Sequence, residues 1–396
     1  MRLREADWYH LIPPEVKEVL RVLGEAGHTA YVVGGAVRDL LLGSTPKDFD
    51  LATSARPEEV GKLFPKTLAV GAQFGIMVVV IGETSVEVAT FRKDGLYVDG
   101  RHPENVEYSS PREDAERRDF TINGLFWCPV KRQVIDFVGG LEDLERRWIR
   151  AIGVAEDRFQ EDALRMMRLF RFLAQLPGFR ACDATLAAVR ARKSGITRVS
   201  PERVTQELRR LLGAPDPLTG LAPLAESGLW REWFGKGAIV STPAWAGEGA
   251  PPFTAWVASL LPEVPEKSRL LLSREESQSL RGLPALVGSL RASLGEPPHR
   301  KKPLLAHRDF FLAHSRLSAA DPTAAQRLLD ERAGFVAAGT LDPPPLAQGS
   351  DLLALGIPAG PALGKILAAI REAQLDEKIA SRAEALALAE KLARYQ

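Results

Sequence analysis

Cysteine is almost absent from this chain of 396 residues, which contains only Cys128 and Cys182. Two distant cysteines do not make a disulfide framework, so the sequence predicts a protein of a reducing compartment, the cytoplasm. No apolar run approaches the roughly 18 residues needed to cross a membrane. The opening MRLREADWYHLIPPEV has no apolar signal core. We therefore expect a cytoplasmic protein without a membrane partner.

Histidine and excess charge of one sign are also scarce. The 52 basic and 51 acidic residues leave a net charge of +1, so a nucleic-acid surface would have to be concentrated on one part of the molecule. None of the six histidines lies in an H-x-x-H or H-D pattern, which gives no sign of a zinc site or a phosphohydrolase. Apolar residues make up 45% and charged residues 26%, as in globular proteins. The length predicts two to four domains.

Residues 31–53, YVVGGAVRDLLLGSTPKDFDLAT, combine a phosphate-binding turn with two carboxylates. An apolar strand runs into Gly34 and Gly35, whose missing Cβ atoms let backbone amides approach a phosphate. The helix that follows adds a favourable dipole and carries Arg38, a fork of donors. Asp48 and Asp50 are one residue apart on the next strand, so both point to one face. Two such carboxylates suit Mg²⁺, which prefers carboxylate and phosphate oxygens.

Two later segments add polar groups to this set. Glu87 lies in a strand of FGIMVVVIGETSVEVATFR and would complete a set of three carboxylates, with a solvent-facing glutamate as the alternative. The segment RRDFTINGL contains Arg117, Arg118, Asp119 and Asn123. Its arginines are suited to clamp a triphosphate and its asparagine to hold a ribose or base edge, so we expect this segment to bind the nucleotide.

Residues 161–172, EDALRMMRLFRF, are predicted to form one helix. At 100° per residue Asp162, Arg165, Arg168 and Arg171 share one half of its circumference. Large apolar residues among them favour a polar pocket wall over a salt-bridged surface helix, which is the alternative. If Asp162 accepts from a base amino group and Arg165 donates to a ring nitrogen, cytosine and adenine match the pair, whereas uracil and guanine do not. Each such bidentate contact discriminates by about 1–3 kcal/mol.

The remaining candidate residues are a loop and two basic segments. Residues 94–103, DGLYVDGRHP, predict a mobile loop near the site, with a plain surface loop as the alternative. Its charged and rigid positions are Asp94, Asp99, Arg101 and Pro103. Candidate contacts to RNA phosphates are Arg203, Arg209 and Arg210 at 200–213, and Arg300, Lys301 and Lys302 at 299–303. Ordinary solvated basic surfaces are the alternative for both.

The order G-G-x-V-R-D, D-x-D, R-R-D-F-T-I-N-G-L and E-D-x-x-R-x-x-R-x-x-R-F resembles the tRNA nucleotidyltransferase and poly(A) polymerase family, in its class II bacterial form. The likeness extends over residues 29–172, then to about 230, and again over 349–396. It implies an α/β nucleotidyltransferase head of the polymerase-β-like type, with a small mixed sheet, at 1–150. An all-α part follows, with a neck that holds the nucleotide-selecting helix at 151–225, a body at 226–340 and a tRNA-binding tail at 341–396.

The resemblance also implies an activity. Such an enzyme adds CMP, CMP and AMP to the tRNA 3′ end from CTP and ATP without a template, using Mg²⁺, or Mn²⁺ in its place. The 3′-OH attacks the α-phosphate and pyrophosphate leaves. The implied roles are metal binding by Asp48 and Asp50, triphosphate binding by Gly35, Arg38 and Arg118, base reading by Asp162 and Arg165, and nucleotide support by Arg168 and Arg171. The expected partners are the acceptor arm and TΨC stem-loop of tRNA.

Several alternatives stay open. An enzyme that adds only the terminal A to CC-ended tRNA is the main one. Addition of CC alone, which the full-length loop at 94–103 disfavours, and poly(A) synthesis are others. An RNA-binding module without catalysis is disfavoured by the intact Arg38, Asp48 and Asp50.

Overall fold

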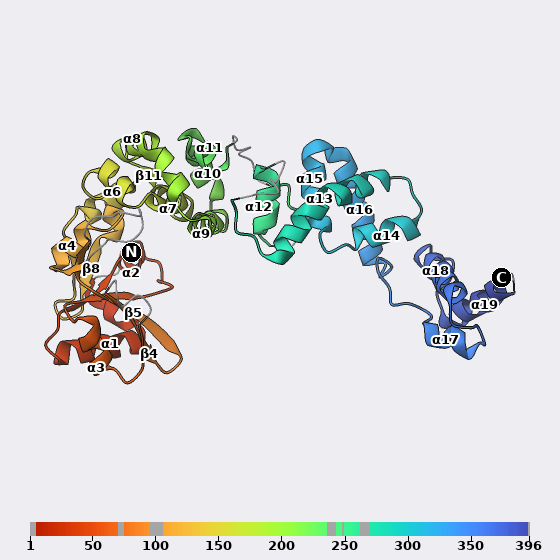
Figure 1. Cartoon of the computed structure of the whole chain (residues 1–396), viewed down its shortest axis with the longest axis horizontal. Helices are drawn as coiled ribbons and strands as arrows, with labels where there is room; N and C mark the ends of the chain where they lie inside the picture. The colour runs from red at the N-terminus through yellow and green to blue at the C-terminus, as the bar shows by residue number, and fades with distance from the viewer. Residues whose placement is uncertain are drawn as a thin grey trace. The chain divides into compact units, whose positions relative to one another are not determined.

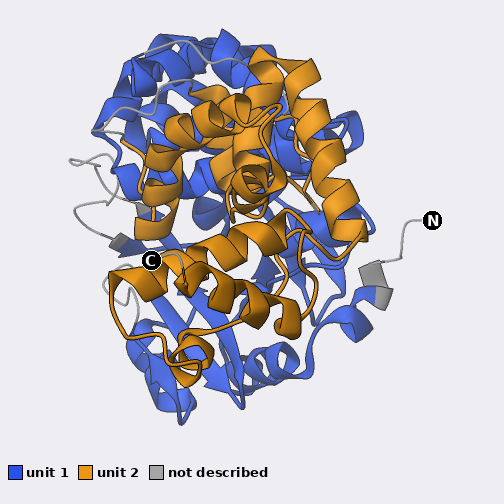
Figure 2. Cartoon of the chain, turned by 90° about the vertical axis from the view of Figure 1, so that its right-hand side faces the viewer, with its two compact units in different colours: residues 1–238 blue, residues 239–396 orange. Residues whose placement is uncertain are grey.

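The computed structural model describes residues 5–69, 75–94, 106–235, 243–247, 249–261 and 269–394. The chain divides into two compact units, Met1–Ala238 and Ile239–Gln396, which are coloured separately in Figure 2. The boundaries expected at 150, 225 and 340 divide the chain more finely than this and stay a prediction. Within the described ranges, no helix combines the length and the apolar character that crossing a membrane requires.

Unit 1 contains a seven-stranded mixed sheet in the order β3-β4-β5-β2-β1-β8-β9. Its strands are β1 (Ala30–Val33), β2 (Asp50–Thr53), β3 (Thr67–Leu68), β4 (Ile76–Ile81), β5 (Thr84–Thr90), β8 (Leu125–Cys128) and β9 (Gln133–Asp136). In this sheet β2 and β5 pair in parallel, and the other neighbours are antiparallel. Beside it β6 (Arg92–Asp94) pairs with β7 (Val106–Tyr108). The small mixed sheet predicted for the head is confirmed.

The register of the central strands places the predicted carboxylates on one face of the sheet. Val32 pairs with Leu51 and Leu51 with Val88, all three are buried, and α1 (Pro14–Glu25) packs against β1 and β5. Because neighbouring strand residues point to opposite sides, Asp50 and Glu87 lie on the opposite face, where both are exposed. The same face also carries the buried Val33 and Ala52, so solvent reaches it at the two carboxylates but not over its whole area.

The helices of unit 1 surround this sheet and continue beyond it (Figure 1). Besides α1 they are η1 (Glu5–Leu11), α2 (Gly35–Leu41), α3 (Pro57–Leu63), α4 (Pro111–Glu116), η3 (Thr121–Asn123), α5 (Gly140–Arg146), α6 (Ala155–Glu161), α7 (Leu164–Gln175), α8 (Asp183–Arg192), η4 (Lys193–Arg198), α9 (Pro201–Leu212), α10 (Pro217–Glu226) and α11 (Leu229–Phe234). Helix α2 begins after Gly34, which has a φ of 70°, a conformation that favours glycine. Residues 31–41 thus form the predicted strand, glycine turn and helix.

Helix α7 is the centre of the helical part of unit 1. It packs against α9 and α10, and Leu164, Leu169 and Phe172 are buried. The predicted single helix over 161–172 is wrong at its start, because Asp162 has an extended backbone and ends α6. Its Oδ1 accepts a hydrogen bond from the Leu164 amide at 3.0 Å and so helps to start α7. The part after 151 is also not wholly helical, since β10 (Trp148–Ile149) pairs with β11 (Arg180–Ala181).

In the described residues of unit 2, every regular element is a helix. Its helices are α12 (Phe253–Leu260), α13 (Arg274–Ala292), α14 (Pro298–Leu305), α15 (Phe310–Ala320), α16 (Pro322–Ala337), α17 (Gly349–Ala354), α18 (Pro361–Leu375) and α19 (Arg382–Ala393). Helix α15 packs against α12, α13 and α16. The last three helices enclose a cluster that includes Leu352, Ile366 and Ile370. These three helices thus share one apolar cluster, and the predicted helical tail at 341–396 stays a prediction as a separate domain.

The basic segment at 299–303 has a structural role in unit 2. The Lys302 ammonium is buried in α14 and donates to the Leu375 carbonyl at 2.8 Å and to Glu377 at 2.9 Å. Lys301 is buried and pairs with Glu331 at 2.6 Å. The prediction that these two lysines contact RNA is therefore wrong, because a buried ammonium requires partners within the protein. Arg300 stays exposed.

Gly220 allows α10 to approach α7 closely. A Cβ atom at this position would lie 2.3 Å from the Phe170 carbonyl oxygen and 3.0 Å from the Ala174 Cβ. We expect Gly220→Ala to lower the free energy of unfolding by about 1–3 kcal/mol, as overpacking does. Urea unfolding of the purified protein measures the change.

Gly24→Ala is the matched control, since Gly24 lies in α1 and a Cβ atom added there would have nothing within 4 Å. This control should be neutral or stabilising by about 0.5–1 kcal/mol, because alanine favours a helix over glycine. Equal effects of the two substitutions would contradict the close contact between α7 and α10.

Candidate active site

The glycine turn between β1 and α2 lies against an arginine. A Cβ atom at Gly34 would come within 3.1 Å of Arg118 Nη1, so the turn and this guanidinium are neighbours. Arg38, on α2, is buried and donates through Nη1 to Asn123 Oδ1 at 2.7 Å and through Nη2 to Asp39 at 2.7 Å. The structure thus brings together three elements that the sequence predicted for phosphate binding.

The predicted carboxylates are exposed at one face of the sheet. Asp50 is the first residue of β2, and Asp48 precedes the strand rather than belonging to it. The alternation still holds, because Phe49 between them is buried and both aspartates are exposed. Loss of solvation around the carboxyl group raises the pKa of Asp50, and the negative charges of Glu87 and Asp48 raise it further. The positive charge of Arg118 opposes this shift.

The donor set at this position suits a hard divalent cation. The mutual repulsion of Asp48, Asp50 and Glu87 is of the kind that a bound cation relieves. In the part of the chain that the structure describes, no group of three or more His, Cys, Asp or Glu is placed to hold a metal ion. Two carboxylates are nevertheless sufficient where substrate phosphates supply the other ligands, as they often do for Mg²⁺. Asp48 and Asp50 are therefore the residues that fit the metal.

A buried carboxylate that the sequence analysis missed orients the two arginines after α4. Asp114 is fully buried and pairs with Arg117 at 2.7 Å and with Arg118 at 3.0 Å. Burial alone would raise the pKa of Asp114, but the two guanidinium groups hold it below its usual value. The spacing of three and four residues was the sequence signal for these pairs.

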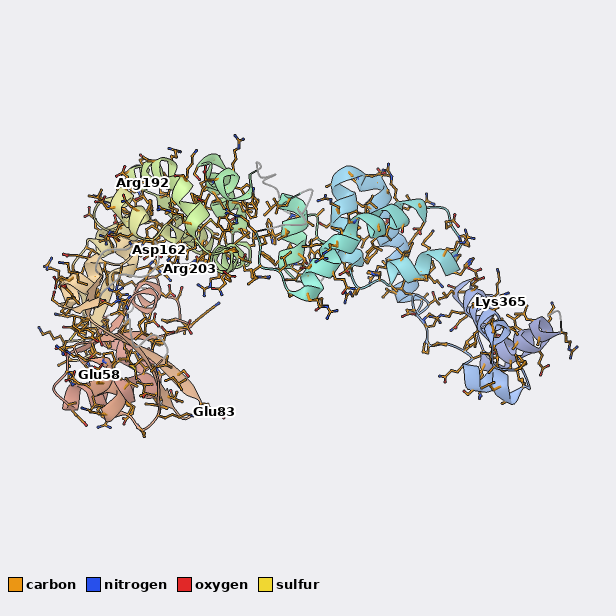
Figure 3. The ribbon with its side chains drawn as sticks, viewed as in Figure 1. Glu58, Glu83, Asp162, Arg192, Arg203 and Lys365 are labelled. Atoms are coloured by element: carbon orange, nitrogen blue, oxygen red, sulfur yellow. The ribbon has the colours of Figure 1, made fainter. Side chains whose placement is uncertain are left out.

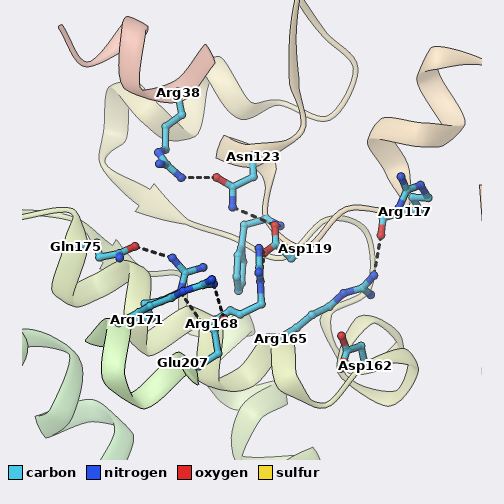
Figure 4. A network of polar contacts seen from close by, with 12 residues as sticks. Arg38, Arg117, Asp119, Asn123, Asp162, Arg165, Arg168, Arg171, Gln175 and Glu207 are labelled. Carbon is cyan, nitrogen blue, oxygen red and sulfur yellow. Dashed lines mark hydrogen bonds and ion pairs between the residues drawn. The ribbon is translucent and has the colours of Figure 1, made fainter. Parts of the chain in front are cut away.

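A chain of polar contacts connects α2 in the sheet region to α7 (Figure 4). Arg38 donates to the Asn123 side chain, whose Nδ2 donates to Asp119 Oδ1 at 3.0 Å. Asp119 Oδ2 in turn accepts from Arg168 Nε at 2.8 Å. Asp119 Oδ1 also accepts from the Phe120 amide at 2.7 Å. Four predicted nucleotide-binding residues thus form one continuous network.

Asp119 is the anionic centre of that network. Burial alone would raise its pKa, but Arg168, Asn123 and the Phe120 amide together lower it to about 2. The carboxylate is therefore ionised under all ordinary conditions. An ionised, hydrogen-bonded Asp119 fixes the orientation of Arg168 and of the Asn123 amide.

Phe172 is a second centre that the sequence analysis missed. The centroid of its ring lies 3.9 Å from Arg171 Cζ, 5.3 Å from Arg38 Cζ and 5.6 Å from Arg168 Cζ. An aromatic face attracts guanidinium groups that have few water contacts. Phe172 thus allows three arginines from α2 and α7 to lie together. Periodicity marked it only as apolar.

The two residues predicted to read the base are each held by the protein. Asp162 pairs with Arg203 of α9 at 2.8 Å (Figure 3). Arg165 pairs with Glu161 at 2.6 Å, and its Nη2 donates to the Arg117 carbonyl at 2.8 Å. Asp162 and Arg165 therefore lie one turn apart beside the Arg117–Asp119 segment, each with its own partner.

Arg171, the last of the predicted nucleotide-binding arginines in α7, pairs with a glutamate of α9. Arg171 donates to Glu207 Oε2 at 2.5 Å and to Gln175 at 2.6 Å. Glu207 is buried, and it also pairs with Arg210 at 3.4 Å. No sequence signal connected Arg171 to a residue 36 positions away.

The loop predicted at 94–103 is described only at its first residue. Asp94 ends β6, whereas Asp99, Arg101 and Pro103 lie outside the described residues.

The depressed pKa of Asp119 gives a test of the network. A carboxylate with a lowered pKa stabilises the fold above its unfolded pKa of about 3.9, and that stabilisation is lost as the pH falls through about 2. Asp119→Asn should therefore lower the free energy of unfolding by about 2 kcal/mol above about pH 4. The difference from the wild type should shrink between about pH 4 and 2.

Urea unfolding at a series of pH values measures this difference. Asp157→Asn, at an exposed position of α6, is the control and should change little. A difference between wild type and Asp119→Asn that stays constant down to the lowest pH would refute the ionised state of Asp119.

Two family descriptions match parts of the chain. Residues 30–150 match "Poly A polymerase head domain", and residues 178–237 match "Probable RNA and SrmB- binding site of polymerase A". The CCA-adding enzyme of Geobacillus kaustophilus is 47% identical over 223 residues, 56% of this chain and 55% of that protein. The CCA-adding enzyme of Bacillus subtilis is 44% identical over 215 residues, 54% of each chain. The chain thus aligns with about half the length of these curated relatives.

Solved structures extend the likeness in fold. The Bacillus stearothermophilus CCA-adding enzyme in complex with CTP has a TM-score of 0.73 at 29% identity and covers 96% of this chain and 98% of its own. A CCA-adding enzyme described as apo form II has a TM-score of 0.76 at 23% identity, with 98% and 97% covered, which shows a shared fold. In residues 30–150 and 178–237 and in its fold, the chain is thus similar to CCA-adding enzymes and to the poly(A) polymerase head and RNA-binding descriptions.

Proposed function

We propose that this protein is a tRNA nucleotidyltransferase that adds C, C and A to the tRNA 3′ end without a nucleic-acid template. The observation that carries the proposal is the meeting of two sites along the Arg117–Asn123 segment. The charge of Arg118 acts on the exposed Asp50, and the carbonyl of Arg117 accepts a hydrogen bond from the proposed base-reading Arg165. The CCA-adding relatives at 44–47% identity support the same assignment.

The phosphate end of the nucleotide is assigned to α2 and to the end of α4. Arg38, Arg118 and the Gly34–Gly35 turn bind the triphosphate with its α-phosphate directed toward Asp48 and Asp50. When Mg²⁺ is bound there, it neutralises charge on the attacking hydroxyl and the departing pyrophosphate. The new bond forms between the RNA 3′ oxygen and the α-phosphorus, and the bond from that phosphorus to pyrophosphate breaks. Mg²⁺ is the proposed ion, with Mn²⁺ as a substitute.

The base end is assigned to the turn between α6 and α7. The Asp162 carboxylate accepts from the exocyclic amino group of cytosine or adenine, and Arg165 donates to the adjacent ring nitrogen. Uracil and guanine present an oxygen to the carboxylate and an N–H to the guanidinium, so both contacts fail. A site built for hydrogen bonding can reject a mismatched partner by about 10⁴-fold.

The RNA is assigned to the helical part. Duplex RNA is recognised mainly through its backbone and shape, so the acceptor arm and TΨC stem-loop are the proposed partners. Among the basic residues predicted to contact phosphates, Arg209, Arg210 and Arg300 remain candidates. Glu87, Asp94, Asp99, Arg101 and Pro103 remain proposals as an additional carboxylate and as loop residues near the site.

Removal of the proposed metal ligands tests the chemistry. Asp50→Asn and Asp48→Asn should each reduce incorporation of radiolabelled CTP by about 10³-fold or more, because the charge that would hold the cation is lost. Circular dichroism should be unchanged, since both side chains are exposed. Glu83→Gln in the β4–β5 turn is an exposed control and should stay active. Incorporation by an Asp48→Asn/Asp50→Asn double variant at the wild-type rate would refute the metal site.

Three tRNA transcripts, ending at the discriminator base, at C and at CC, test the function itself. Each is incubated with the metal ion and CTP, ATP or both. Extension of the bare end by CC with CTP, and by CCA with both nucleotides, is the expected result. Activity confined to the CC-ended transcript with ATP would make the protein an A-adding enzyme. Extension that stops at CC, or long A tails on unrelated RNA, would replace the proposal with the corresponding alternative.

A further inference from the structure

The carboxylate proposed to accept the base amino group is held by an arginine from another helix. Arg203 of α9 donates from Nη2 to Asp162 Oδ2 at 2.8 Å. The other oxygen, Oδ1, accepts from the Leu164 amide at 3.0 Å. The two side chains are 21% and 16% exposed, so solvent screens this pair only weakly.

These two contacts fix the plane of the Asp162 carboxylate. Each carboxylate oxygen has two acceptor sites, and one site on each is taken by a donor of the protein. Rotation of the group would break both bonds, yet one acceptor site on each oxygen stays available to a base. An ionised carboxylate offers only acceptors, and its fixed plane determines the direction in which they point. A base edge can then meet Asp162 and Arg165 together only where its amino group faces Asp162 and its ring acceptor faces Arg165, an arrangement that uracil cannot match.

Helix α9 is itself fixed to α7 by a second ion pair. Glu207, one turn after Arg203, is buried and pairs with Arg171 at 2.5 Å. Residues four apart lie on the same face of a helix. Arg203 and Glu207 therefore connect α9 to two points, Asp162 just before α7 and Arg171 within it. The packing of α9 against α7 therefore fixes the position of Arg203, which does not move freely at the surface.

We propose that Arg203 is a positioning residue for base selection, which acts by orienting Asp162. The expectation from the sequence, that Arg203 contacts RNA phosphates, is replaced by this role. The inference rests on the proposed function, because it takes Asp162 to be the acceptor of the base amino group.

The test compares Arg203→Ala and Arg203→Lys with the wild type. The value of kcat/KM is measured for CTP and for UTP on a tRNA transcript that lacks CCA, and the Kd of the transcript is measured by filter binding. Arg203→Ala should lower the preference for CTP over UTP by about 10- to 100-fold, the range expected from one charge-assisted hydrogen bond. The Kd for tRNA should change by less than about twofold, because the proposal assigns Arg203 to Asp162 and not to an RNA phosphate. Arg203→Lys, which keeps a cationic donor, should restore part of the preference.

Arg192→Ala is the matched control. Arg192 is an exposed arginine at the end of α8, and its removal takes away the same charge from unit 1. This variant should keep the wild-type preference for CTP. Thermal unfolding of all variants separates a loss of fold from a loss of selection, and Arg203→Gln replaces Arg203→Ala if the latter does not fold.

Three outcomes would overturn the proposal. A weaker Kd for tRNA with an unchanged preference for CTP would make Arg203 an RNA contact. Equal losses for CTP and UTP, with a lowered unfolding midpoint, would make its role purely structural. If calorimetry shows that neither the wild type nor Arg203→Ala binds CTP more tightly than UTP, there is no base selection for Arg203 to support. Failure of the wild type to extend any transcript, with CTP still preferred over UTP in calorimetry, would instead refute the transfer reaction and leave the role of Arg203 standing.

Discussion

The partly buried ion pair between Asp119 and Arg168 is the interaction on which the rest of the site depends. It joins the segment after α4 to helix α7, and Asn123 extends it to Arg38 on α2. The groups assigned to the phosphates and the helix assigned to the base are thereby parts of one network. Loss of Arg168 would leave the charge of the buried Asp119 with less compensation, which is destabilising. The geometry of the site is therefore inseparable from the stability of unit 1.

The same principle explains how a chain of net charge +1 concentrates arginine in one place. Asp114 holds Arg117 and Arg118, and Glu207 holds Arg171. Each buried acid balances part of the positive charge and fixes the direction of the guanidinium groups. The arginines are consequently ordered before any substrate arrives, which reduces the entropy lost on binding.

The sequence predicted the parts of this site whose signals are local. The glycine turn and the exposed Asp48 and Asp50 are set by turn chemistry and alternation, which few neighbouring residues determine, whereas the small mixed sheet was expected from the family resemblance. It did not predict the break at Asp162, because a helical period continues through a residue whose side chain caps the next helix. It also missed Glu207, and it placed Lys302 at the surface. Those roles depend on partners 36 and 73 or more positions away, and no pattern within a helix encodes such pairs.

The close approach of α10 to α7 at Gly220 has a consequence for how successive nucleotides are accommodated. Where two backbones touch, no side chain lies between them that can change rotamer and absorb a shift. Helix α7 is therefore held in a fixed position against α10 at this point. In the proposed reaction, the growth of the RNA by one nucleotide would then be accommodated by translation of the RNA or by rearrangement on the sheet side of the site, and not by a shift between these two helices.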